Sequence, residues 1–276
     1  MAVAIKGDAH PAGDPPVITD EGIPSKCLSL SVRADWGHFR RIDRTVTKQT
    51  YRIPPRTTIA GLLAAIVGVG RDGYYDVFAS DSSAIAIEAC SELRTMALPS
   101  LGLGTNPDET FDDAGGTGQR TVKVRFPDST DNRQLHGYHY LVSPVYRIDV
   151  AVEDPAFYGT LRHRLRNGCS HYTPTMGLSE LLAAVDWHGE YEPARIAGSE
   201  TVAIDSVLPD GVDAIIPTPE TSYAVERVPG FMTTDSGGRH TTGFIDYAFV
   251  PNGDPLQART SAITPVQIDG RTVVFR

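Results

Sequence analysis

The stretch "RADWGHFRRIDRTVTKQTYRIPPRTTIAGLLAAIVG", residues 33–68, joins a basic, aromatic-rich segment to a segment of small and apolar residues. From Arg33 to Arg56, seven cations stand against two anions, a local balance of +5 in a chain with a formal charge of -9, so the other residues sum to -14. Clustered charge of one sign concentrates ligands of the opposite sign. We therefore expect this segment to bind a polyanion. The alternative is a solvated loop with one or two aromatic side chains turned into the core.

The second half of this stretch predicts a helix. A proline pair ends the preceding loop, Thr57 or Thr58 can cap the helix, and Gly68 can end it. One helix face is apolar and carries Ile59, Leu62, Leu63, Ile66 and Val67. The other face is small and carries Ala60, Gly61, Ala64 and Ala65. A glycine inside a helix lowers helix stability by about 1 kcal/mol relative to alanine, so the presence of Gly61 calls for a structural explanation. We hypothesise that this small face receives RNA backbone or a neighbouring subunit; the alternative is packing against the protein's own sheet.

The remaining pattern indicates an α+β fold. Alternating apolar residues predict strands over 27–34, 83–90, 144–152 and 200–209. Further helices are expected after the Asp154–Pro155 cap and over 177–187. The order strand, helix, strand, strand, helix, strand is that of a ferredoxin-like (βαββαβ) palm. It is also the layout of the RNA-recognition motif, in which an open sheet face stacks bases.

A long insertion interrupts this pattern at about 99–142. Its first part is rich in glycine and aspartate, and the alternating segments 121–126 and 135–142 are expected to be the arms of a hairpin. We expect three parts in the chain: a mobile leader over 1–26, a palm over 27–209 that includes the insertion, and a short β-rich extension over 210–276.

The composition limits the function classes. The sequence contains no run of 18 apolar residues, so no membrane helix is predicted. The N-terminal residues lack the apolar region of a secretory signal, and we expect a cytoplasmic protein. Cys27, Cys90 and Cys169 are widely spaced without a C-x-x-C pair, which indicates neither disulfides nor a zinc site. No cofactor or metal is expected. Of 34 acids 23 are Asp, and of 25 bases 21 are Arg; this bias resembles proteins of salt-loving archaea, the alternative being a mildly acidic mesophile protein.

RNA binding requires cations for phosphates and aromatic rings for bases. The loop after the first strand supplies both, and cations also occur in the insertion. The candidate RNA-binding residues are Arg33, Trp36, Gly37, Arg40, Arg41, Arg44, Lys48, Tyr51, Arg56, Lys123, Arg125 and Arg133. No dinucleotide loop, nucleophile elbow or histidine cluster with metal-ligand spacing competes with this interpretation.

Three segments resemble one known family. They are "GHFRR" followed by "TYRIPPRTTIAGLLAAIVG" (37–41 and 50–68), "SPVYRIDVAV" (143–152) and "HYTPTMGLSELLAAV" (171–185). The combination resembles the Cas-five (Cas5) family of CRISPR-associated subunits, most closely its haloarchaeal type I-B branch, and covers most of residues 27–186. The resemblance implies a ferredoxin-like palm with an inserted hairpin thumb at about 99–142. It also implies binding of the repeat-derived 5′ handle of CRISPR RNA at one end of the type I Cascade complex, beside Cas-seven (Cas7) backbone subunits and the large Cas-eight (Cas8) subunit.

The resemblance leaves catalysis open. One branch, type I-C, cuts precursor CRISPR RNA with tyrosine, lysine and histidine, and places lysine and histidine side by side in the thumb. Here Lys123 is followed by Val124, and the nearest histidines, His136 and His139, alternate with tyrosines on one strand. We therefore expect a non-catalytic RNA-binding subunit. The alternatives are a metal-independent endoribonuclease, or a ferredoxin-like protein that binds only proteins or a small ligand.

Overall fold

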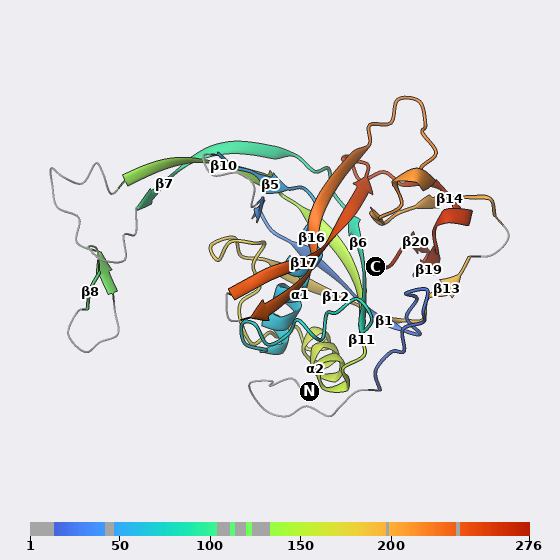
Figure 1. The fold of residues 1–276 in the computed structure, drawn as a ribbon, viewed down its shortest axis with the longest axis horizontal. Coiled ribbons are helices and arrows are strands. Elements are labelled where there is room, and N and C mark those ends of the chain that lie inside the picture. The colour runs from blue at the N-terminus through green and yellow to red at the C-terminus, as the bar shows by residue number, and fades with distance from the viewer. Residues whose placement is uncertain are drawn as a thin grey trace.

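The computed structural model describes residues 14–41, 47–103, 111–113, 120–122, 133–196, 199–235 and 238–276. Over these ranges the chain forms a body with two α-helices among many strands, and a long arm reaches out from it (Figure 1). The helices are α1 (Arg56–Val67) and α2 (Pro155–Arg166), with single 3-10 turns at Val212–Ala214 and Thr260–Ala262.

The strands of the first part are β1 (Cys27–Arg33), β2 (Trp36–Gly37), β3 (Phe39–Arg40), β4 (Thr47–Lys48), β5 (Thr50–Tyr51), β6 (Ser83–Ala89), β7 (Thr95–Leu103), β8 (Phe111–Asp113), β9 (Arg120–Val122), β10 (Arg133–Val142), β11 (Val145–Val152) and β12 (Ala184–Tyr191). The later strands are β13 (Ala194–Arg195), β14 (Thr201–Ile204), β15 (Leu208–Pro209), β16 (Ala224–Asp235), β17 (Gly238–Phe249), β18 (Leu256–Arg259), β19 (Val266–Ile268) and β20 (Arg271–Val273). The predicted mixture of helices and strands is confirmed.

A four-stranded antiparallel sheet with the order β12-β1-β11-β6 forms the centre of the body. Along the chain, its strands and the two helices follow one another as β1, α1, β6, β11, α2, β12. Alternate residues of a strand point to opposite faces. In β1, Leu28 and Leu30 belong to the core that contains both helices, whereas Cys27 belongs to a second core with β19 and β20. The sheet is therefore covered on both faces.

Helix α1 is packed on two sides. Its residues Ile59, Leu63 and Ile66 are buried in the same core as Val228 of β16 and Ile245 of β17. The helix thus lies between the central sheet and the β16–β17 hairpin (Figure 1). The apolar face was predicted correctly, but the cap was not: the N-cap residue is Pro55, without a side-chain hydrogen bond. The predicted C-terminus is confirmed, since Gly68 takes the left-handed conformation with φ 93°.

Helix α2 begins as the sequence predicts. The Asp154 side chain accepts a hydrogen bond of 2.7 Å from the Phe157 amide, and Pro155 occupies the first helical position. Phe157 and Leu161 point into the core next to α1. A capped N-terminus and an apolar stripe together fix this helix on the sheet.

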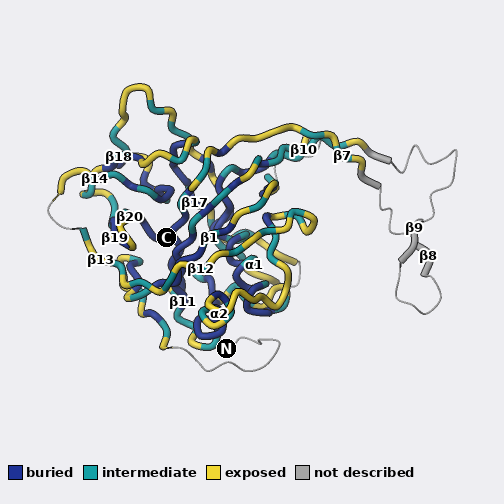
Figure 2. Tube along the Cα trace, turned by 180° about the vertical axis from the view of Figure 1, so that it is seen from behind, coloured by how far each residue is buried: buried dark blue, intermediate teal, exposed yellow. Residues whose placement is uncertain are grey.

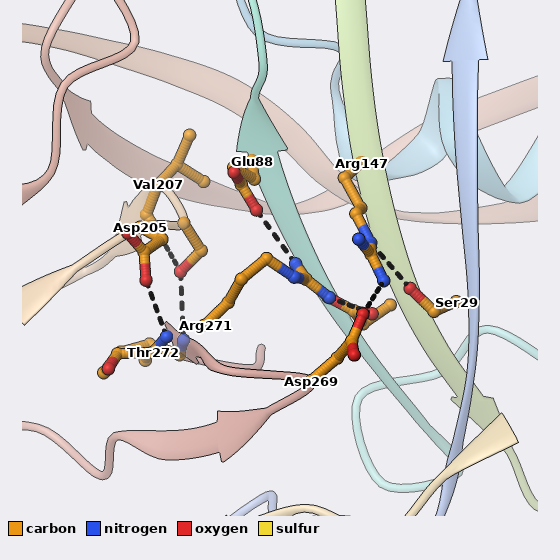
Figure 3. A network of polar contacts seen from close by, with 11 residues as sticks. Ser29, Glu88, Arg147, Asp205, Val207, Asp269, Arg271 and Thr272 are labelled. Carbon is orange, nitrogen blue, oxygen red and sulfur yellow. Dashed lines mark hydrogen bonds and ion pairs between the residues drawn. The ribbon is translucent and has the colours of Figure 1, made fainter. Parts of the chain in front are cut away.

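The second face of the sheet is covered by β19 and β20. The guanidinium of Arg271 in β20 donates two hydrogen bonds, of 2.9 and 3.0 Å, to the carboxylate of Asp149 in β11. It also donates to Glu88 in β6 at 2.9 Å, and Arg147 binds Asp269 at 2.8 Å beside it (Figure 3). The Asp149 side chain is 1% exposed. The face that an RNA-recognition motif leaves open for bases is therefore closed in this chain.

Two predicted elements differ in the structure. Residues 184–191 form β12, paired with β1, where a helix over 177–187 was predicted. The leucine spacing before this strand fits a helix, but the alternating exposure of β12 is that of a strand at a sheet edge. The predicted strand over 200–209 divides into β14, which pairs with β18, and β15, which pairs with β17. Neither belongs to the central sheet.

The arm consists of β7 and β10, paired antiparallel from Thr95↔Leu141 to Leu103↔Arg133. The sequence predicts that 121–126 pairs with 135–142. Residues 123–126 lie outside the described residues, and for residues 121–122 the pairing is wrong, because β9 pairs with β8 and β10 pairs with β7. The tube in Figure 2 shows β7 exposed along most of its length, unlike β1, β6 and β11 of the central sheet. Of the expected leader, residues 14–26 are described, and Ile23 packs in the second core.

We expect Arg271→Ala to destabilise the fold strongly. The change leaves the Asp149 carboxylate buried without its cation, a loss of about 3–5 kcal/mol in the free energy of unfolding. The matched control is Arg195→Ala, which removes a 2.7 Å ion pair with Glu21 in which both side chains are more than half exposed; such pairs contribute about 0–1 kcal/mol. Urea unfolding of both variants measures the difference, and equal losses would contradict this account of the network.

Candidate nucleic-acid interface

An aromatic surface forms where the basic loop meets the arm. Strand β2 pairs antiparallel with the body end of β10, and β4 pairs parallel with its middle. This pairing places the Trp36 ring 6.1 Å from the Tyr140 ring, edge to face. Tyr138 and Tyr140, two residues apart on one face of β10, have ring centroids 5.8 Å apart at an angle of 21°. Lys48 lies opposite Tyr138 in the register. We call Trp36, Lys48, Tyr138 and Tyr140 the aromatic surface; all four are partly exposed.

A buried histidine supports this surface from below. His38 is 1% exposed, and its ring centroid lies 5.3 Å from that of Tyr138 and 5.7 Å from that of Tyr140. Burial lowers the pKa of His38, which favours the neutral ring. Its Nδ1 lies 2.8 Å from the His139 carbonyl oxygen, which can only accept, so Nδ1 carries the proton. The uncharged imidazole therefore packs against the two tyrosine rings and links β2 to β10.

Several predicted cations lie around the aromatic surface. Arg40 is exposed on β3, close enough to His38 to influence its titration. Lys48 is part of the surface itself. The guanidinium carbon of Arg41 lies 5.1 Å from the Tyr51 ring centroid. Arg33 ends β1 at the surface, and its Nε donates to Asp186 at 3.1 Å. The loop thus places Lys48 opposite Tyr138 and leaves Arg40 exposed two residues after His38, while Arg33 is neutralised by a neighbour.

Two predicted residues lie in the core instead. Arg56 is 1% exposed; its Nη2 donates to the carbonyl and hydroxyl oxygens of Ser83, and its guanidinium carbon lies 4.9 Å from the Phe231 ring centroid. Burial lowers the pKa of Arg56 to about 10. Tyr51 is 7% exposed and belongs to the main core. Neither side chain is available to a polyanion in this arrangement, because both are enclosed by the protein itself. We leave both out of the site.

Glycines bring the loop after α2 against the aromatic surface. A Cβ on Gly37 would lie 2.9 Å from the Met176 side chain, and one on Gly177, at φ 98°, would lie 2.0 Å from the His38 carbonyl oxygen. The His38 amide also donates to the Met176 carbonyl at 3.0 Å. Gly37, predicted from the sequence as a candidate RNA-binding residue, therefore makes room for the protein's own segment 173–177.

Some predicted residues cannot be placed. Arg44, Lys123 and Arg125 lie outside the described residues, and Arg133 begins β10 with its side chain outside the described part. Conversely, the sequence analysis missed Tyr138 and Tyr140 as binding residues. Their spacing of two on a predicted strand was the available signal, since it places both rings on one face.

In the described ranges, no group of three or more His, Cys, Asp or Glu side chains could hold a metal ion. Among the described helices, none is long and apolar enough to span a bilayer.

The sequence matches a family model described as CRISPR-associated protein (Cas_Cas5) over residues 27–235. Because the match covers more than half of the chain, the chain belongs to the Cas5 family of CRISPR-associated proteins. No curated protein matches it. The type I-B and haloarchaeal assignments stay predictions.

Two solved structures share the fold. One, described as a CRISPR RNA-guided surveillance complex, is 14% identical with a TM-score of 0.52; the alignment covers 86% of this chain and 92% of that chain. The other, a CRISPR protein from Archaeoglobus fulgidus, is 15% identical with a TM-score of 0.53, and the alignment covers 91% of this chain and 99% of that chain. At these identities the likeness concerns the fold alone.

Proposed function

We propose that this protein is the non-catalytic subunit of a type I CRISPR surveillance complex that binds and caps the 5′ handle of CRISPR RNA. The observation that carries the proposal is the aromatic surface, which includes Lys48, together with the exposed Arg40 on the adjoining strand β3. Exposed rings stack on bases of any sequence, and cations bind the phosphates between them. Membership of the Cas5 family and the surveillance complex with the same fold support this assignment.

The fold supplies a place for each expected part. We assign the central sheet with α1 and α2 to the ferredoxin-like palm, and the arm of β7 and β10 to the thumb. Strand β10 belongs to the arm, and the part of it that carries Tyr138 and Tyr140 also pairs with β2 and β4 of the basic loop. RNA bound on the aromatic surface would therefore lie at the base of the thumb. We further propose Cas7 and Cas8 subunits as partners, in the cytoplasm of a salt-loving archaeon.

Stacking on the rings gives the first prediction. Removing the ring in Tyr140→Ala should weaken binding of single-stranded RNA about 5- to 150-fold, since stacking on one base contributes about 1–3 kcal/mol. Tyr140→Phe, which keeps the ring, should bind as the wild type does, and so should Tyr172→Ala, which removes an exposed tyrosine outside the aromatic surface. Fluorescence anisotropy with a labelled oligonucleotide measures all three. Unchanged affinity in Tyr140→Ala would exclude stacking on this ring.

The cations give the second prediction. The double variant Arg40→Ala/Lys48→Ala should bind RNA more weakly and with a smaller salt dependence. Each lost phosphate contact lowers the slope of log K against log salt by about 0.7 for a single strand, so the expected reduction is about 1.4. The control is Arg166→Ala/Arg195→Ala, which removes two exposed cations elsewhere on the surface. If the two double variants have the same slope, the RNA lies elsewhere.

Cleavage distinguishes the main alternative. Metal-independent RNA cleavage needs a base for the 2′-hydroxyl and an acid for the leaving oxygen. His136 and His139 are partly exposed on β10 and could supply such groups, which keeps an endoribonuclease as the second candidate. We expect labelled repeat RNA to stay intact with the purified protein in a chelator. Cutting at one defined bond would replace the proposal by this alternative, whereas failure to retain RNA at any salt concentration would favour a protein that binds only proteins or a small ligand.

A further inference from the structure

A cleft of about 410 Å³ lies beside the small face of α1. Its walls are the partly exposed side of α1, the segment after α1 with Tyr74 and Tyr75, the loop 173–177, and the β16–β17 hairpin. Gly61 and Ala65 contribute the helix wall, whereas Ala60 and Ala64 are buried in the core. The small face predicted from the sequence therefore divides: half of it packs internally, and half of it borders the cleft.

The lining of the cleft is mixed in polarity. Leu62 and Met232 supply apolar surface. Thr58, Thr173 and Thr175 line the cleft as well, and within the described part of the chain no hydrogen bond engages their hydroxyls. A pocket of several hundred Å³ that mixes apolar surface with hydroxyl-bearing side chains suits a small planar ligand that has hydrogen-bonding edges.

The cleft carries no net charge. Among its described lining residues the one cation is Arg239, whose Nε lies 2.6 Å from the Asp72 carboxylate. Tyr75 donates a second hydrogen bond to Asp72 at 2.7 Å. Phosphate binding needs positive charge that is not already neutralised. In this cleft Arg239 is paired with Asp72, so a phosphate is disfavoured. A neutral nucleobase meets no such obstacle, and hydroxyl groups such as those of the threonines can form hydrogen bonds with its edges.

The cleft and the aromatic surface share a wall. The loop 173–177 borders the cleft through Thr173, Thr175 and Gly177. The same loop is bound to the aromatic surface by the hydrogen bond from the His38 amide to Met176 and by the close contact of Gly177 with the His38 carbonyl. Gly177 is exposed and carries no side chain, so RNA bound on the aromatic surface would meet no side chain from this residue on a path to the cleft.

We propose that this cleft receives one unstacked nucleobase of the RNA that the aromatic surface binds; the inference rests on the proposed function. Single-stranded RNA is recognised by splaying bases into pockets with hydrogen-bonding groups. Gly61 keeps the cleft open, since a Cβ at this position would lie 3.1 Å from the Tyr74 hydroxyl and a larger side chain would occupy the space.

The test pairs protein variants with RNA that lacks single bases. A set of single-stranded RNA oligonucleotides carries one abasic site at successive positions, and affinity is measured for each with the full-length protein. In the wild type, one position should lose about tenfold in affinity because its base fills the cleft. In Gly61→Leu the intact RNA should already bind about tenfold more weakly, and the abasic site at that position should cause no further loss. Positions stacked on Tyr138 and Tyr140 should stay sensitive in both proteins.

Two further variants make the result decisive. Gly70→Leu is the matched control, because nothing lies within 4 Å of a Cβ at Gly70, and it should behave as the wild type. Thr58→Val keeps the shape and removes one hydroxyl; it should weaken binding of intact RNA and reduce the loss at the same position. It also serves in place of Gly61→Leu if circular dichroism shows that variant to be unfolded.

The outcomes separate the inference from the function on which it rests. If the wild type binds RNA and both cleft variants show the wild-type pattern at every position, the cleft receives no base and the inference is overturned while RNA binding stands. The same conclusion follows if Gly61→Leu keeps the pattern but no longer assembles with the other subunits, since the cleft would then hold a protein partner. If the wild type retains no RNA, the proposed function and the inference fail together.

Discussion

The buried carboxylate of Asp149 is the constraint on which the arrangement of the body depends. It lies on a central strand with 1% of its side chain exposed, and it requires a cation within the protein. Arg271 supplies that cation from β20, 122 residues later in the chain. The ion pair between Arg271 and Asp149 therefore holds β19 and β20 on the second face of the sheet. With one face under the helices and the other under these strands, the sheet presents no open face to a nucleic acid, and the candidate interface lies at the margin where β2, β4 and β10 meet.

The sequence predicts local features well where one interaction decides them. The Asp154 cap, the Gly68 terminus and the apolar face of α1 follow from rules that span fewer than eight residues. The basic loop was also recognisable, because its charge contrasts with the rest of the chain. Of its members, Lys48 lies opposite Tyr138 in the strand register, and Arg40 is exposed on β3.

What the sequence could not predict depends on partners far along the chain. The leucines before β12 have helical spacing, but β1 requires a neighbour at that edge, and pairing decides the outcome. Arg56 belongs to a basic run, yet Ser83 and Phe231 enclose it in the core. The cleft likewise needs α1, the loop 173–177 and the β16–β17 hairpin together. No window of the sequence contains these three elements at once.

The double packing of α1 has a consequence for the order of folding. The helix is made early in the chain, but one of its sides is completed only by Val228 and Ile245. The second face of the central sheet is covered only after β19 and β20, which come still later in the chain, have been synthesised. A nascent chain that ends before these strands exposes apolar surface on both layers, and contacts of such long sequence separation form slowly. The protein is therefore vulnerable to aggregation during synthesis, and a partner that shields α1 until the hairpin arrives would increase its yield.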